Sequence, residues 1–131
     1  MTQTLDQKRA ALAWGYATAS MQQYGKEYKR LAKGAPALIM NSGLMPTLAF
    51  YKDKGKKVPA AQRLLDDLIR GLSLRLAENA LNAGHGVQLF PKFMEMLQRG
   101  ESREYMRYTD EALELLKWIR QFVDAVDAEA A

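Results

Sequence analysis

The sequence lacks cysteine and contains a single histidine, His85. Without cysteine the chain can form no disulfide, and thiol catalysis and thiolate metal ligation are excluded. His85 stands between two glycines, with no serine or cysteine partner at a known catalytic spacing, and a metal site needs several ligands. We therefore interpret His85 as a loop residue without a chemical role, and we expect no metal site and no cofactor.

The motifs of nucleotide-binding and zinc enzymes are also missing. The chain has no Walker loop, no nucleotide-binding glycine fingerprint and no HExxH sequence. Four carboxylates could in principle support acid–base catalysis or bind a divalent ion: Asp66, Asp67, Glu111 and Glu114. Nearby cations instead favour surface ion pairs along a helix, such as Asp66 with Arg70 and Glu114 with Lys117. The sequence thus indicates no catalytic residue and no small-molecule substrate.

Long apolar segments are absent as well. No uncharged apolar run reaches the length of a membrane span. The N-terminal charges of Asp6, Lys8 and Arg9 leave no apolar stretch typical of a signal peptide. We expect no membrane contact and a cytoplasmic protein. With 131 residues, of which 48% are hydrophobic and 26% charged, the chain has the composition of one globular domain.

Strand patterns are nearly absent, whereas apolar residues recur at helical spacing. This predicts an all-α fold, a compact bundle of about four main helices plus short helices, with no sheet. A capping box at Thr4 and Gln7 would begin the first helix, which would run through Tyr24 and, if Gly25 is tolerated, toward Lys33. Gly34 would stop this helix, Pro36 would lie in the first turn of the next one, and Gly43 would end it. The other helices are expected at 36–43, 46–54, 59–81, 87–98 and 102–126, in a single domain 1–131 with a frayed tail at 127–131.

Several apolar side chains are expected to form the core. They are Leu5, Leu12, Tyr16 and Ala19 of the first helix, Leu64, Leu65, Leu68, Leu72 and Leu76 of the helix at 59–81, and the methionines Met40, Met45, Met94 and Met96. The last helix would bury a broad apolar face: Tyr105, Tyr108, Ala112, Leu115, Leu116, Ile119, Phe122, Val123 and Val126. Trp118 is expected to be buried or to lie at an interface, because tryptophan is frequent among the residues that dominate binding energy.

The net charge of +4 is unevenly distributed. Residues 1–57 carry ten Lys and Arg against three acids, a net +7, and residues 58–131 carry nine against twelve, a net −3. Such asymmetry favours one surface for an anionic partner and another for a protein. A solvated charged surface without a partner would give the same pattern.

Two basic clusters account for most of the positive charge. Four cations spaced at i, i+3, i+4 and i+7 share one helical face: Lys26, Lys29, Arg30 and Lys33. Like charges on one face repel each other, so this face would gain from a polyanion, and Tyr28 beside it could stack on a base. The second cluster is interpreted as a flexible loop that contacts phosphates without reading bases: Lys52, Lys54, Lys56 and Lys57. These eight residues are the predicted binding site for a nucleic-acid backbone.

Two segments resemble the small subunit of the type III-B (Cmr) CRISPR RNA-guided effector complex. The first comprises Tyr24-Gly25, Leu31, Pro36-Ala37-Leu38-Ile39, Asn41, Gly43-Leu44 and Thr47-Leu48-Ala49-Phe50, and the second comprises Tyr108-Thr109, Glu111-Ala112-Leu113, Leu116, Trp118 and Phe122. A variable middle separates them. Gln121 departs from the family pattern, in which a basic residue precedes the phenylalanine.

This resemblance implies an all-helical, non-catalytic subunit that binds RNA. In that family several copies stack head to tail beside a filament that holds the guide RNA, and they steady the guide–target duplex through its phosphates. Other subunits cleave the target. The expected partners are therefore guide and target RNA, other Cmr subunits and further copies of this chain.

Two alternatives remain open. A helical module could bridge other subunits with no direct RNA contact, its lysines serving only solubility. A small helical enzyme that uses His85 with Asp66 or Glu78 is the less favoured alternative.

Overall fold

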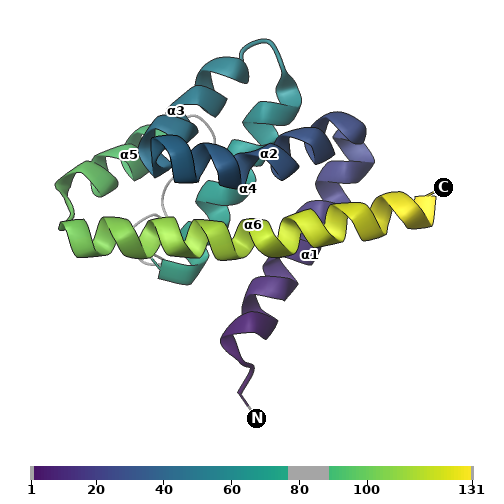
Figure 1. Ribbon diagram of the computed structural model, residues 1–131, viewed down its shortest axis with the longest axis horizontal. Coiled ribbons are helices and arrows are strands. Elements are labelled where there is room, and N and C mark those ends of the chain that lie inside the picture. Colours follow the sequence, from purple (N-terminus) through teal and green to yellow (C-terminus); the bar gives the residue numbers. More distant parts are fainter. Residues whose placement is uncertain (1, 77–88, 131) are drawn as a thin grey trace.

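The computed structural model describes residues 2–76 and 89–130, with side chains through Asp127 (Figure 1). This part of the chain is helical and contains no strand, so the predicted all-α fold without a sheet is confirmed. The elements are α1 (Leu5–Tyr24), α2 (Lys26–Ser42), α3 (Leu44–Lys54), α4 (Pro59–Leu76), α5 (Leu89–Arg99) and α6 (Ser102–Ala130). None of the described helices is long and apolar enough to cross a membrane.

Helix α4 is the centre of the molecule, because it contacts each of the other five described helices. Its sequence is apolar on several sides, which suits a helix surrounded by others. Five of its large side chains are fully buried: Leu64, Leu65, Leu68, Ile69 and Leu72. Each such burial contributes about 1.5–3 kcal/mol, so α4 supplies much of the stabilisation of the fold. The four leucines were correctly predicted, and the predicted continuation of this helix to residue 81 lies outside the described residues.

Helix α6 runs along the whole length of the molecule and packs against α1 and α2 (Figure 1). Its buried face repeats at helical spacing, as predicted: Tyr108, Ala112, Leu115, Leu116, Ile119 and Val123. The helix continues to Ala130 and so passes the predicted end at Val126. This extension brings Asp127 beside α2, where it forms an ion pair with Lys29.

Helix α1 begins at the predicted capping box. The Thr4 hydroxyl accepts from the backbone N–H of Gln7 at 3.1 Å, and the Thr4 N–H donates to the Gln7 side chain at 2.7 Å. The predicted inward stripe is only half correct. Leu12 and Tyr16 are partly buried and pack against the core, but Leu5 is 46% exposed and Ala19 is also exposed. The buried residues are Ala13, Ala17, Ser20 and Met21. Most of these are small, which lets α1 lie close to its neighbours, and the large apolar residues fall on its flanks.

The boundary between α1 and α2 also differs from the prediction. Gly25 adopts φ +58°, which glycine tolerates and other residues rarely adopt, and the first helix ends there. Helix α2 then continues through Gly34 and Pro36 instead of stopping at Gly34. Pro36 removes one intrahelical hydrogen bond, but burial of one continuous apolar face outweighs this cost: Tyr28, Leu31, Ala32, Ala35 and Ile39.

The methionines expected in the core divide into two groups. Met45, Met94 and Met96 are partly buried and pack against the core. Met40 is 75% exposed, so its prediction as a core residue is wrong. An unbranched apolar side chain at a solvent-exposed helix position is a candidate contact for another molecule.

Gly43 makes the turn between α2 and α3 with φ +96° and ψ 163°, a region open to glycine almost alone. Gly43→Ala should therefore lower the free energy of unfolding by about 1–3 kcal/mol, measured by urea denaturation. Gly34→Ala is the matched control, because Gly34 is exposed within α2 and an added Cβ meets no side chain there. The control should raise stability by about 0.5–1 kcal/mol. Equal effects of the two substitutions would contradict the strained turn.

Candidate nucleic-acid interface

The first predicted basic cluster lies on the N-terminal half of α2. Lys26, Arg30 and Lys33 are exposed and Lys29 is half-buried, so the predicted face exists. Tyr28 does not belong to it. Its side chain is fully buried and its hydroxyl donates to Asp67 at 2.7 Å, which overturns its prediction as a surface stacking residue.

The basic face of α2 is paired with the acidic end of α6, a contact that the sequence analysis missed. The Lys29 Nζ lies 2.7 Å from an Asp127 oxygen and 3.3 Å from one of Asp124, and the Lys33 Nζ lies 2.8 Å from Asp124. Hydrogen bonds from these lysines lower the pKa of both carboxyls, and the Asp127 bond raises the pKa of Lys29. We call these four residues the α2–α6 clamp. It offsets the expected repulsion between the lysines.

The other two cations of the first cluster differ in their surroundings. Arg30 forms an ion pair with Glu27, one turn earlier on the same helix. Lys26 has no ion-pair partner among the described residues. Lys26 is thus the cation of this face that is most accessible to an external anion.

The second basic cluster spans the end of α3 and the turn that follows it. Lys52 and Lys54 are helical, which confirms the predicted helix end at residue 54. The interpretation of the whole cluster as a flexible loop is therefore wrong for these two lysines. Lys52 lies 5.7 Å from the ring centre of Phe90, and Lys54 lies 5.7 Å from that of Phe50, both within the range of cation–π attraction.

The two lysines of the following turn are both exposed. Lys56 lies 3.5 Å from Asp53 in an exposed ion pair, which contributes little to stability. Lys57 has no ion-pair partner in the described part of the chain. Lys57 therefore resembles Lys26 in being open to an external anion.

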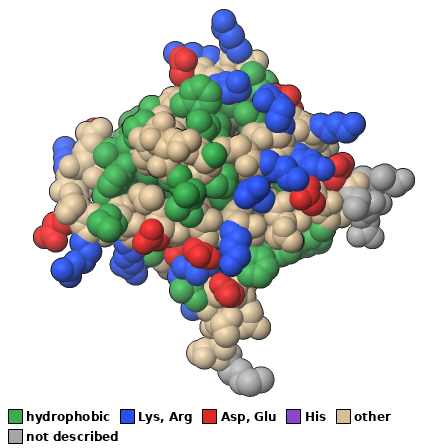
Figure 2. All heavy atoms as spheres, viewed as in Figure 1, with side chains coloured by type: hydrophobic (Ala, Val, Ile, Leu, Met, Phe, Trp, Pro, Cys, Tyr) green, Lys and Arg blue, Asp and Glu red, His purple; other side chains and the backbone are tan. Residues whose placement is uncertain are grey.

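The two clusters lie on the same side of the molecule. Figure 2 shows Lys and Arg side chains from the top of the view, over the turn between α3 and α4, down to the N-terminal half of α2. We call the eight cations of the two clusters the basic band. Two acids lie within it, Asp53 paired with Lys56 and Glu27 paired with Arg30, and further acidic side chains border it beside the end of α6. One extended anion could therefore contact both clusters at once.

A groove between α2 and α6 adjoins this band and has a volume of about 620 Å³. Pro36 and Met40 of α2 and Leu113 and Trp118 of α6 supply its apolar lining, and Lys117 and Arg120 lie at its edge. The spacing of the α6 residues could have indicated a shared face, but nothing local in the sequence says that α2 lies opposite.

The structure contains neither of the two predicted surface ion pairs, Asp66 with Arg70 and Glu114 with Lys117, among its described residues. Asp66 accepts a hydrogen bond from Gln62, and Glu114 lies 3.9 Å from Arg9 in place of Lys117. Within the described residues no group of three or more potential ligands could hold a metal ion. His85 and Glu78 lie outside the described residues.

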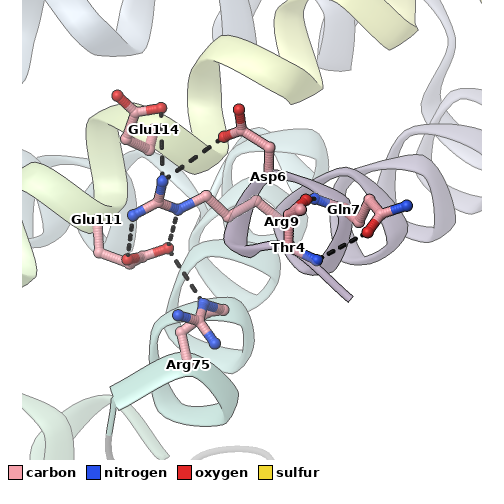
Figure 3. A network of polar contacts seen from close by, with 7 residues as sticks. All are labelled: Thr4, Asp6, Gln7, Arg9, Arg75, Glu111 and Glu114. Atoms are coloured by element: carbon pink, nitrogen blue, oxygen red, sulfur yellow. Dashed lines mark hydrogen bonds and ion pairs between the residues drawn. The ribbon is translucent and has the colours of Figure 1, made fainter. Parts of the chain in front are cut away.

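Glu111 is buried in an ion network that joins three helices (Figure 3). The Arg9 guanidinium of α1 donates to both of its carboxylate oxygens at 2.7 and 2.8 Å, and Arg75 of α4 lies 3.4 Å away. Burial alone would raise the pKa of Glu111, but the bonds and charges of the two arginines outweigh it and lower that pKa. A carboxylate held ionised by two arginines is a structural anion and a poor general acid.

Asp67 is the second buried carboxylate. The hydroxyls of Ser20 and Tyr28 both donate to one of its oxygens at 2.7 Å, and Arg63 lies 3.4 Å from the other. Burial raises the pKa of Asp67 by more than these partners lower it. Asp67 therefore ties α1 and α2 to α4, and its surroundings are structural.

The profile of the family described as CRISPR-associated protein (Cas_Cmr5) matches residues 5–126. The chain belongs to the Cmr5 family. Members of this family are subunits of the type III-B CRISPR (Cmr) complex, so the resemblance found in the sequence is confirmed.

A solved structure supports the same assignment. The Cmr5-family chain is similar to a CRISPR-associated Cmr5 family protein from Thermus thermophilus, known from an X-ray crystal structure, with a TM-score of 0.73 and 25% sequence identity. The similarity covers 95% of this chain and 98% of that one. No curated protein sequence matches the chain.

Proposed function

We propose that this Cmr5-family chain is a non-catalytic subunit that contacts the backbone of guide and target RNA without sequence specificity. The basic band carries this proposal, since both clusters lie on one side of the molecule. Lysine contacts to phosphates hold a nucleic acid in place but carry no sequence information. The structural surroundings of Glu111 and Asp67 support a role without catalysis.

The proposal includes several copies of the chain within a cytoplasmic Cmr complex. Of the four cations on the basic face of α2, only Lys26 has no carboxylate partner within the described residues, so one copy alone would bind RNA weakly. Copies arranged along one RNA strand would bind far more tightly, because each further contact becomes intramolecular. Binding should therefore depend on assembly and on salt.

A salt series tests the basic band. RNA binding by the purified chain would be measured with single-stranded and duplex RNA, for wild type and for a variant with Lys26, Lys29, Arg30 and Lys33 changed to Ala. We expect the variant to bind more weakly, and its plot of log affinity against log salt to be flatter by roughly 0.7 per lost contact with single-stranded RNA.

A charge-matched control separates specific contacts from net charge. It changes four exposed cations on the α5–α6 side to Ala: Lys92, Arg99, Arg103 and Arg107. The control should keep most of the affinity and the salt slope. If RNA affinity falls by the same factor in both quadruple variants, the basic band is not the RNA-binding surface.

The α2–α6 clamp should compete with RNA for Lys29 and Lys33. Changing Asp124 and Asp127 to Asn would release both lysines, so we expect tighter RNA binding and a steeper salt dependence. A control with Glu101→Gln and Asp110→Asn removes two exposed acids of the α5–α6 turn and of α6. If RNA affinity rises equally in both double variants, the change in net charge explains the rise. The clamp then does not compete with RNA for the two lysines.

Exposed apolar side chains favour the alternative, in which the chain bridges subunits without contacting RNA. Outside the groove these include Phe50 at 48%, Leu74 at 50% and Met106 at 64% exposure, and such side chains often mark protein contacts. Co-assembly with other Cmr subunits that withstands high salt, together with no RNA affinity in any setting, would support this alternative over RNA binding.

A further inference from the structure

The groove between α2 and α6 combines an aromatic ring, an apolar lining and cations. Trp118 lines it beside Met40, whose side chain is 75% exposed. Phe122 holds the Trp118 ring at 5.7 Å between ring centres and itself packs edge-to-face on Trp14. The ring of Trp118 is thus fixed before any ligand arrives.

The charge around the groove is mainly positive. Lys33, Lys117 and Arg120 line it, against one acid, Asp124. Lys117 and Arg120 have no ion-pair partner among the described residues, and only Lys33 is held by Asp124. Two cations therefore remain for a ligand, and an anion is the ligand that they complement.

The groove also continues the basic face of α2, because Lys33 belongs to both. A chain of phosphates that follows Lys26, Lys29 and Lys33 would lead directly to Trp118. A single-stranded nucleic acid provides phosphates and apolar base faces in one molecule.

We propose that this groove is a stacking site for a nucleobase of single-stranded RNA, with the base against Trp118 and Met40 and the adjoining phosphates on Lys117 and Arg120. This rests on the proposed function and assigns to it residues outside the eight basic ones. Stacking tolerates any base, because every base has a flat aromatic face. The site would therefore add affinity without adding sequence specificity.

Fluorescence tests the stacking directly. The chain has two tryptophans, so Trp14→Phe leaves Trp118 as the only one. The full chain would be titrated with oligouridylate and, separately, with inorganic polyphosphate of similar charge at the same ionic strength. We expect oligouridylate to quench Trp118 emission in parallel with binding, and polyphosphate to bind without quenching.

Substitutions give a second readout. Trp118→Leu should weaken single-stranded RNA binding at least about fivefold, the lower end of the effect of losing one base–aromatic stack, and Trp118→Phe should retain most of the affinity. Lys117→Ala with Arg120→Ala should flatten the salt slope by roughly 0.7 per cation. Arg103→Ala with Arg107→Ala, two exposed cations of α6 outside the groove, is the matched control, and thermal unfolding checks that each variant is folded.

The outcomes distinguish the stacking site from the proposed function. Unchanged RNA affinity in folded Trp118→Leu, with weakened binding in the quadruple basic variant, would overturn the stacking site alone. Loss of co-assembly with Cmr subunits at unchanged RNA affinity would show that the groove binds protein, and would also overturn it. If no form of the chain contacts RNA, either alone or crosslinked to 4-thiouridine RNA in the assembled complex, both proposals fail.

Discussion

Glu111→Ala should lower the free energy of unfolding by about 3 kcal/mol, as expected when one partner of a buried ion network is removed. The substitution leaves two arginine side chains, Arg9 and Arg75, which are only 15% and 17% exposed, without their shared carboxylate. It also removes the ion pairs that join α1 and α4 to α6. Urea denaturation at neutral pH, followed by circular dichroism, measures the change.

Glu114→Gln is the control for this network. Glu114 is 39% exposed and lies 3.9 Å from Arg9, so its loss should cost no more than about 1 kcal/mol. A comparable loss of stability in the two variants would contradict the structural role assigned to Glu111.

The Glu111 network should also depend on pH. Folding lowers the pKa of Glu111, so its stabilisation is complete above the pKa of the unfolded chain and is lost as the pH falls through the folded pKa. The difference in stability between wild type and Glu111→Gln should therefore shrink in acid. A difference that grows in acid would contradict the lowered pKa.

Asp67→Ala should lower the free energy of unfolding by about 2–4 kcal/mol, because it leaves the buried hydroxyls of Ser20 and Tyr28 without their shared acceptor. Asp67→Asn should cost less, since the amide oxygen can still accept a hydrogen bond. Denaturation of both variants tests this order, and equal costs would mean that the hydroxyl contacts contribute nothing.

The pH dependence of Asp67 has the opposite sign to that of Glu111. Burial raises the pKa of Asp67 in the folded chain, so its favourable contribution holds below the unfolded pKa and declines as the pH rises through the folded pKa. Asp67→Asn should therefore be less destabilising at pH 7 than at pH 4. Denaturation midpoints of wild type and Asp67→Asn at the two pH values measure the destabilisation. A larger destabilisation at pH 7 than at pH 4 would contradict the raised pKa of Asp67.

Local patterns in the sequence were sufficient for most of the helices. The capping box at Thr4, the glycine at the end of α2 and the apolar repeat of α6 depend on neighbouring residues, and each is found as predicted. The prediction failed where tertiary packing outweighed a local signal. Gly34 and Pro36 suggest a helix end, yet the buried face of α2 continues past both.

The candidate site was only half predictable, because its partners are distant in sequence. The basic residues were identified from their spacing, but Lys29 and Asp127 are 98 residues apart. Arg9 and Glu111, 102 residues apart, likewise meet only in the folded chain. The groove beside Trp118 has the same origin, since it exists only where α2 lies along α6.

RNA binding by the reconstituted Cmr complex tests the central claim most directly. Complexes would be assembled with the wild-type chain, with the Lys26, Lys29, Arg30 and Lys33 quadruple Ala variant, or with the control quadruple variant, and titrated with target RNA across a salt series. We predict weaker binding and a flatter salt dependence for the basic-band variant alone. Equal affinity and slope in all three complexes, with equal incorporation of the chain, would contradict the claim that this subunit contacts RNA.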